Sequence, residues 1–418
     1  VYGAAGWLPY GKFIAPISVW CNWLAWSPVL ALGTSLGAGY VMASLFPADA
    51  AIRQWQLDLL PLDFIREGLH LRINLVSIIA TGFLLLTFAL QHHGAARAAH
   101  FQRILGIACM LPLLLVGIVP LITGDLPTQN LFPLLPIARD AAGNIGFGVW
   151  DAAGLTLLAG AMFGAGWSTY GFETAVCYTR EFRDPAKDTA RALFASGLLC
   201  MAIFTLVPLV FQASLGLEGM LDPSIYDGSG VANALAKILG GGAVIGNLLI
   251  VMLVLALLLI VMTSMMGSSR TLYQASVDGW FPRYLSRVNS HGAPTAAMWT
   301  DLVFNLVLLL ASDYFAVLMI SNVCYFVFNF LNLQSGWIHR IDRSDWNRPY
   351  RCPTWLLATG AVFGFVNMVW MGAGADVWGE GTLRNGLLAV LLIIPVFAYR
   401  HYVQDKGQFP IPDGDGEG

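Results

Sequence analysis

Charged residues are scarce in this chain of 418 residues. Asp, Glu, Lys and Arg together make up 11% of it, whereas 57% is hydrophobic. A soluble domain carries about 25% charged residues because its surface must be solvated by water. With a mean hydropathy of +0.67, the chain has too few charges to cover a water-facing surface of this size. The scarcity excludes an ordinary soluble protein and indicates that lipid is the surrounding solvent.

The sequence also lacks the motifs of common soluble enzymes and metal sites. It contains no GxxxxGK[ST] loop for ATP, no HExxH and no CxxC pair. Its six cysteines have no metal-type spacing with histidine, and we expect no disulfide among them. The net charge of -3 and the absence of a basic tract give no indication of nucleic acid. We therefore expect no enzyme, no cofactor, no metal and no nucleic-acid partner.

Ten apolar runs could cross a bilayer as α-helices. A hydrocarbon core about 30 Å thick needs about 20 helical residues, and a helix satisfies its own backbone polar groups in lipid. The runs are Phe13–Phe46, Leu71–Gln91, Ile104–Thr123, Ala152–Tyr178, Ala190–Leu215, Ala243–Ser269, Thr295–Ala311, Tyr314–Ser335, Pro353–Ala375 and Leu383–Tyr402. The sequence thus predicts an all-α membrane protein, with residues 1–418 forming one polytopic domain.

Lys and Arg alternate between the two sides of these runs. Sixteen of the 22 basic residues precede the first run or follow an even-numbered one, and six lie on the other side. Because loops rich in Lys and Arg stay in the cytoplasm, we expect both termini there and a location in the cell (inner or plasma) membrane. The tail, residues 407–418, is rich in Pro, Gly and acids, and we expect it to be disordered.

One carboxyl group lies inside an apolar run. Glu173 belongs to the segment WSTYGFE, residues Trp167 to Glu173, in the fourth run. An ionisable group at the centre of a span costs at least ~2.5–3.5 kcal/mol and normally faces a cavity or a partner. Two interpretations stay open. Glu173 either reaches the cytoplasmic interface and pairs with Arg180, or is a protonatable or gating carboxyl group beside a substrate site.

Glycines punctuate the same run. A glycine inside a helix costs about 1 kcal/mol relative to alanine, and close helix packing is a sufficient reason for Gly160 and Gly164. Packing does not predict the polar and aromatic residues between Trp167 and Gly171 at mid-span. They indicate a helix that breaks there, so that backbone groups face a cavity, as in transporters.

Other polar residues in the runs are weaker candidates. Ser264, Ser268 and Ser269 end the sixth run and could bind Na⁺, but serines in such positions more often donate hydrogen bonds to nearby carbonyls. Asp301, near the start of the seventh run, is expected to pair with a nearby basic residue.

Two blocks carry a family likeness. WSTYGFETAVCYTREFRDPAKDTARAL, from Trp167 to Leu193, resembles the sixth-helix signature of the amino acid–polyamine–organocation superfamily. In place of its usual Ile-Pro-Arg-Ala the chain has Thr-Ala-Arg-Ala from residue 189. The block from Ser268 to Thr295 is similar to the eighth helix of the superfamily and the loop after it.

The opening segment resembles the third helix of the branch of amino acid and amine exchangers. The ten runs would then be family helices three to twelve, and the first two helices would lie upstream of Val1. In the alternative, Gly33–Gly39 is the glycine-rich break of the first family helix, which would place both blocks two spans too early.

The resemblance implies a LeuT-type inverted-repeat transporter fold. Residues 13–123 would be part of the first repeat, 152–335 the second repeat and 353–402 two extra helices. Family analogy makes Trp167 an aromatic gate, lets Ser168, Thr169 and Tyr170 line the unwound substrate site with Gly171 at the break, and makes Glu173 the proton-linked gate. Some proton-coupled relatives have a lysine in helix five where Cys109 is nearest here, which favours exchange.

The resemblance also implies a function. We expect a secondary active transporter of an amino acid or related amine, working by alternating access through exchange or proton coupling. Its partners would be that small molecule, the lipid bilayer, H⁺ or Na⁺, and a second copy or a larger membrane complex. The alternative is a non-transporting, permease-like subunit of such a complex.

Overall fold

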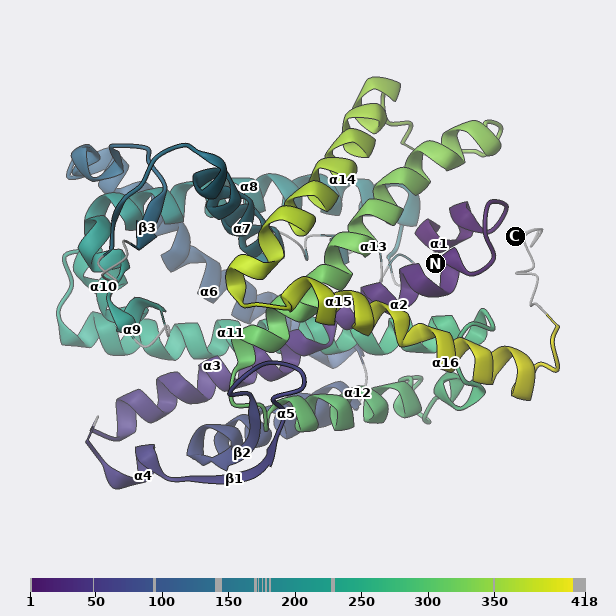
Figure 1. Cartoon of the computed structure of the whole chain (residues 1–418), viewed down its shortest axis with the longest axis horizontal. Helices are drawn as coiled ribbons and strands as arrows, with labels where there is room; N and C mark the ends of the chain where they lie inside the picture. Colours follow the sequence, from purple (N-terminus) through teal and green to yellow (C-terminus); the bar gives the residue numbers. More distant parts are fainter. Residues whose placement is uncertain are drawn as a thin grey trace.

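The protein is a bundle of long helices that lie side by side along its longest axis (Figure 1). The computed structural model describes residues 2–47, 49–92, 95–139, 145–168, 171, 173–174, 176, 179, 182–226, 230–348 and 350–408. The helices of the first part are α1 (Tyr2–Trp7), α2 (Ile14–Trp26), α3 (Pro28–Leu45), α4 (Ala51–Gln54), α5 (Leu75–His92), α6 (Ala95–Thr123) and the short 3₁₀ turn η1 (Thr128–Leu131).

The second part is also helical. Its elements are α7 (Ala152–Ser168), α8 (Pro185–Met220), α9 (Pro223–Tyr226), α10 (Val231–Ile238), α11 (Ala243–Val277), η3 (Arg283–Ser286), α12 (Thr295–Leu308), α13 (Tyr314–Asp342), α14 (Thr354–Gly374), η4 (Ala375–Trp378), α15 (Thr382–Leu391), α16 (Ile393–Ala398) and η5 (Tyr399–Gln404).

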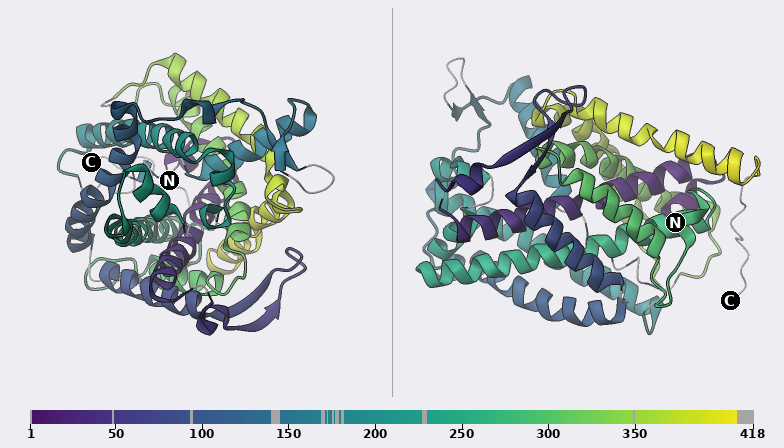
Figure 2. Two further views of the ribbon diagram at one scale, coloured as in Figure 1. Left: turned by 90° about the vertical axis from the view of Figure 1, so that its left-hand side faces the viewer. Right: turned by 90° about the horizontal axis from the view of Figure 1, so that it is seen from below.

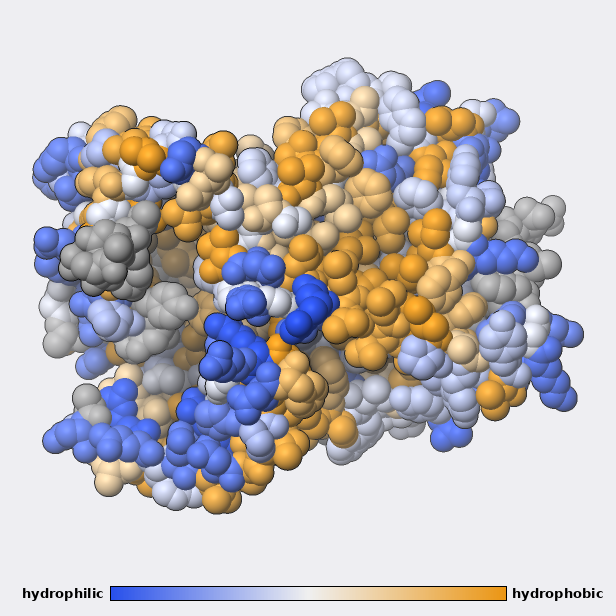
Figure 3. Space-filling model, viewed as in Figure 1, coloured by the Kyte–Doolittle hydropathy of each residue, from blue (hydrophilic) through white to orange (hydrophobic). Residues whose placement is uncertain are grey.

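Eight of the described helical segments are long and apolar enough to cross a membrane. The helices α7 and α12 are apolar but shorter. The ten predicted runs fall on these ten segments, and since two are short, the count of ten spans stays a prediction. In the most apolar part of α8 only 6% of the residues are buried. A broad hydrophobic area lies to the right of the centre of the face in Figure 3, as expected of a multi-pass membrane protein.

Local sequence explains where several helices begin. Pro28 occupies the first turn of α3, where its missing N–H is not needed, so α2 and α3 meet at Ser27 and form one segment of 32 residues. Helix α8 begins in the same way at Pro185, and the Asp184 side chain accepts a hydrogen bond from the backbone N–H of Lys187.

The core lies where α2 and α3 pack against α11 and α13. Aromatic residues pack together in one cluster: Trp20 and Trp23 of α2 contact each other and, respectively, Phe281 after α11 and Phe304 of α12. Two views of the bundle show α2 and α3 surrounded by later helices (Figure 2). The free cysteines among the described residues include the buried pair Cys21 and Cys324.

Two small antiparallel hairpins lie at one end of the bundle (Figure 1). One pairs β1 (Gln56–Pro61) with β2 (His70–Asn74), and the other pairs β3 (Ile137–Arg139) with β4 (Ile145–Phe147). The second predicted run therefore began four residues too early, because Leu71–Asn74 is strand. Its backbone pairs with the turn after α12, where the N–H of Arg72 donates to the carbonyl of Leu310 over 2.7 Å.

The opposite end holds η3, the α13–α14 turn and the end of η5, as Figures 1 and 2 show. There Asp405 accepts hydrogen bonds from Nε of Arg400 at 2.6 Å and Nη2 of Arg283 at 2.7 Å. Partial burial alone would raise the pKa of Asp405, but the two guanidinium groups outweigh it and hold the pKa below its usual range. This three-residue contact ties the C-terminal helix to the segment after α11.

Candidate functional site

The helix that contains the predicted site is interrupted. Helix α7 ends at Ser168 and α8 begins at Pro185. Between them Gly171 has φ +115°, in the left-handed half of conformational space that only glycine enters without strain. The described residues that follow, Glu173, Thr174, Val176 and Thr179, form tight 3₁₀ turns. The chain therefore leaves the regular helix at the position where the sequence predicted a break.

Hydrogen bonds fix the local backbone around this break. The carboxylate Oε2 of Glu173 accepts the backbone N–H of Gly171 at 2.9 Å. The carbonyl of Gly171 accepts both the backbone N–H of Thr174 at 3.1 Å and its hydroxyl at 2.5 Å. Glu173 thus holds the turn from within. Its predicted partner Arg180 lies outside the described residues.

The other predicted site residues lie at the end of α7. The half-buried indole of Trp167 packs against a core cluster that includes Phe163 and Phe326. Ser168 is half-buried, and its hydroxyl donates to the carbonyl of Ala165 at 2.8 Å. Thr169 and Tyr170 lie outside the described residues.

The glycines of α7 allow close packing against η4. A methyl group on Gly164 would lie 2.4 Å from a ring carbon of Trp378, and one on Gly160 would lie 2.7 Å from Val377. The indole N–H of Trp378 also donates to the carbonyl of Gly160 at 2.8 Å. Real Cβ contacts are never this short, so these two glycines serve helix packing, the structural role that their spacing indicated.

Sequence reasoning missed Trp26 as a site residue. This buried side chain at the end of α2 lies between the break and α11: a Cβ on Gly171 would be 3.8 Å from its Cη2, and one on Gly267 would be 3.7 Å from its Cε3. Trp26 and Gly171 are 145 positions apart, and nothing in the local sequence indicates that they lie close together. Trp26 and Trp167 place two indoles near the interrupted helix.

Comparison with known proteins identifies the family. The profile of the amino acid permease family matches residues 1–394. The chain belongs to the amino acid permease family. It is similar to the branched-chain amino acid permease BcaP of Lactococcus lactis subsp. cremoris, with 24% identity over 378 residues, covering 88% of this chain and 76% of the relative. It also resembles an uncharacterized transporter of Legionella pneumophila, with 27% identity over 187 residues, 43% of this chain and 37% of the relative.

These matches confirm the superfamily predicted from the two sequence blocks and point to a transporter rather than an enzyme. This permease is a multi-pass membrane protein of amino acid transport. The interrupted helix lies within the matched region, as do all the candidate site residues.

Two of the three candidate serines of α11 in this permease, Ser268 and Ser269, have hydrogen-bond partners without an ion. The hydroxyl of Ser269 donates to the carbonyl of Met265 at 2.6 Å, and that of Ser268 donates to Oδ2 of Asp301 at 2.5 Å. Ser264 is buried one turn earlier. The hydrogen bonds of Ser268 and Ser269 agree with the simpler of the two interpretations, and the ion site stays an untested prediction.

The expected basic partner of Asp301 is wrong. Its carboxyl group is fully buried and accepts hydrogen bonds from Ser268, from the hydroxyl of Ser27 at 2.5 Å and from the indole N–H of Trp23 at 2.9 Å. The expectation failed because a carboxyl group inside an apolar bundle can be solvated by neutral donors from neighbouring helices, and sequence alone does not reveal them.

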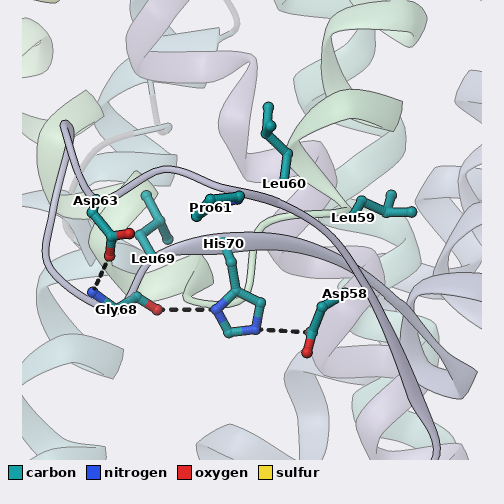
Figure 4. Close-up of a pocket in the computed structure, with 8 residues that line it drawn as sticks. All are labelled: Asp58, Leu59, Leu60, Pro61, Asp63, Gly68, Leu69 and His70. Atoms are coloured by element: carbon teal, nitrogen blue, oxygen red, sulfur yellow. Dashed lines mark hydrogen bonds and ion pairs between the residues drawn. The ribbon is translucent and has the colours of Figure 1, made fainter.

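A hollow of about 310 Å³ lies on the β1–β2 hairpin, away from the interrupted helix (Figure 4). Within it His70 faces the carboxylate of Asp58 through Nε2 at 3.2 Å and the carbonyl of Gly68 through Nδ1 at 3.0 Å. The remaining lining is Leu59, Leu60, Pro61, Asp63 and Leu69. Because this hollow lies on the β1–β2 hairpin and not beside Gly171, the transport site is not assigned to it.

Proposed function

We propose that this permease is a secondary active transporter of amino acids or related amines that works by alternating access, by exchange or proton coupling. The observation that carries the proposal is that helix α7 ends at Ser168 and Gly171 leaves helical geometry, within the fourth predicted run of a chain from the amino acid permease family. Backbone that leaves a helix at membrane depth is tolerated where it lines a cavity or is buried in protein.

The end of α7 offers a place for the ammonium group of the substrate. The last carbonyl groups of a helix have no intrahelical donor, and the helix dipole gives that end a partial negative charge. A substrate –NH₃⁺ would complete these hydrogen bonds, with Ser168, Thr169 and Tyr170 lining the unwound stretch. Gly171 would permit the break, Trp167 would cover the substrate and Glu173 would act as the proton-linked gate.

The surroundings favour a neutral substrate with an apolar side chain. The described side chains near the break include Trp26, Trp167, Phe163 and Phe326, beside the carboxyl group of Glu173. The relative BcaP is named a branched-chain amino acid permease. Leucine, isoleucine, valine and their amines are therefore the first substrates to test.

The remaining architecture is proposed with this function. We infer ten spans, a partial first repeat over residues 13–123, an inverted second repeat over residues 152–335, and both termini in the cytoplasm. The end that carries η3, the α13–α14 turn and η5 would then face the cytoplasm, and the two hairpins would lie outside.

Uptake of labelled leucine into liposomes that contain the purified protein tests the proposal. We expect time-dependent uptake that unlabelled isoleucine and valine suppress and aspartate does not. Protein-free liposomes and a Trp26→Ala variant are the controls, and the variant should bind leucine more weakly because it removes an indole beside the break. If folded wild type neither binds nor accumulates any amino acid or amine of the panel, a non-transporting role replaces the proposed one.

A further inference from the structure

A buried polar network joins three parts of the bundle around Asp301. The carboxyl group of Asp301, on α12, contacts Trp23 and Ser27 at the α2–α3 junction and Ser268 on α11. Asp301, Ser27 and Ser268 are all 0% exposed. Asn305, one turn further along α12, extends the network to α3. Among the residues that the structure describes, no basic side chain takes part in it.

The hydrogen-bond directions at Oδ1 are fixed by the backbone. The N–H of Ala31 donates to Oδ1 of Asn305 at 3.2 Å, which sets the orientation of that amide. Its Nδ2 therefore donates to the hydroxyl oxygen of Ser27 at 2.8 Å. The Ser27 hydrogen is then left to point at Oδ1 of Asp301, which also accepts the indole N–H of Trp23. An indole can only donate, so Oδ1 is occupied by two donors.

The hydrogen-bond direction at Oδ2 is reversible. Its described partner is the hydroxyl of Ser268, which also lies 3.4 Å from the carbonyl of Met265. If Oδ2 carries a proton, it donates to Ser268, and the Ser268 hydrogen turns to Met265. Every polar atom keeps a partner, and only one hydroxyl rotates. The network therefore accommodates a neutral carboxylic acid whose proton lies on Oδ2.

We propose that Asp301 is a proton-binding site whose exchangeable proton resides on Oδ2 and is held by Ser268. A charged carboxylate sealed in an apolar bundle without a cation is unfavourable, so the packed arrangement favours the neutral acid. When the contact between α11 and α12 opens to water, the proton leaves Oδ2 for water and the carboxylate remains. Closing the contact takes one proton up again.

The ionisable groups described on the surrounding elements do not neutralise the Asp301 carboxylate in place of this proton. The elements packed against Asp301 are α2, α3, α5, α11 and η3. Their ionisable residues are Cys21, Tyr40, His92, Arg270, Tyr273, Arg283 and Tyr284. None belongs to the hydrogen bonds and ion pairs of Asp301, whose partners are Trp23, Ser27 and Ser268. Arg283 pairs with Asp405, and the hydroxyl of Tyr284 contacts Thr300.

The proton site adjoins the candidate substrate site through the chain itself. Ser27 directly follows Trp26, and Ser268 directly follows Gly267, where an added Cβ would lie 3.7 Å from the Trp26 ring. Movement of Trp26 when a substrate enters the break at Gly171 would shift both hydroxyl partners of Asp301. The coupling of proton release to substrate rests on the proposed transport function, whereas proton binding itself does not.

Infrared spectroscopy of the purified protein in lipid tests proton binding directly. A protonated carboxyl group has a carbonyl stretching band distinct from that of carboxylate. We expect this band in wild type at neutral pH and, in Asp301→Asn, the loss of the component that Asp301 contributes. Ser268→Ala, which removes the acceptor of the proton, should shift the band, and Thr263→Ala, a hydroxyl on the same helix that bonds only within α11, should leave it in place.

The outcomes separate this inference from the proposed function. A spectrum unchanged in Asp301→Asn shows an ionised Asp301 and overturns the proposal. If that variant does not fold, a band unaffected by Ser268→Ala overturns it equally. A pH-sensitive dye inside liposomes then measures protons moved per leucine, and Asp301→Asn should abolish this flux. If wild type moves no amino acid at all, the transport proposal fails while the infrared result still stands.

Discussion

Replacing Gly171 with alanine isolates the contribution of the interrupted helix. At φ +115° an alanine is strained, and such backbone strain costs about 1–3 kcal/mol. The new Cβ would lie 3.8 Å from Trp26, an ordinary contact, so packing adds no cost. The penalty falls on the broken arrangement, and 1–3 kcal/mol corresponds to about 5- to 150-fold in its population.

The assay is the initial rate of labelled leucine uptake at matched amounts of reconstituted protein. We expect Gly171→Ala to lower it at least about fivefold while the variant still elutes as a folded protein. Gly372→Ala is the matched control, because Gly372 lies in α14 and a Cβ there meets nothing within 4 Å. A Gly171→Ala rate equal to wild type would refute the reasoning, and an equal loss in Gly372→Ala would show that it is not specific to the break.

Four further predictions follow from the same structure. Glu173→Gln should flatten the dependence of transport on pH, whereas identical profiles for variant and wild type would remove Glu173 from the mechanism. Gly164→Ala should destabilise the protein by about 1–3 kcal/mol in thermal unfolding, because its Cβ would overlap Trp378; unchanged stability would contradict the α7–η4 packing. A single cysteine at Ser290 should be labelled from the cytoplasmic side, and one at Lys237 from the outside. Labelling of both positions from the same side would contradict the ten-span topology. The folded protein lowers the pKa of Asp405. Ionised Asp405 therefore contributes its full stabilisation above the ordinary pKa of about 3.9, and this contribution is lost as the pH falls below that value. Acid should lower the unfolding temperature more in wild type than in Asp405→Asn.

Sequence alone could locate the membrane helices and the helix break. Apolar runs reflect the lipid environment directly, and the segment from Trp167 to Gly171 stands out because polar and aromatic residues interrupt one of them. The sequence did not predict the hairpins, because their residues do not stand out from the apolar runs beside them. Leu71–Asn74 reads as part of an apolar run, yet its backbone pairs with β1 and with the turn after α12.

The buried partners of the site could not be predicted from local patterns. Asp301 gave a visible signal as a carboxyl group in an apolar run, but its donors Trp23 and Ser27 are more than 270 residues away. The contact of Trp26 with the break is equally remote in sequence. Such contacts depend on how α2 and α3 lie against α11 and α12. The sequence pattern along one helix does not indicate that arrangement.

Counterflow tests the central claim, alternating access, most directly. Liposomes that contain the permease and an excess of unlabelled leucine are diluted into a trace of labelled leucine, with no ion gradient. A carrier that exposes one site to each side in turn predicts a transient accumulation of label above its equilibrium level, lost in Gly171→Ala. A simple approach to equilibrium would indicate a channel, and no entry of label would indicate a protein that does not transport leucine.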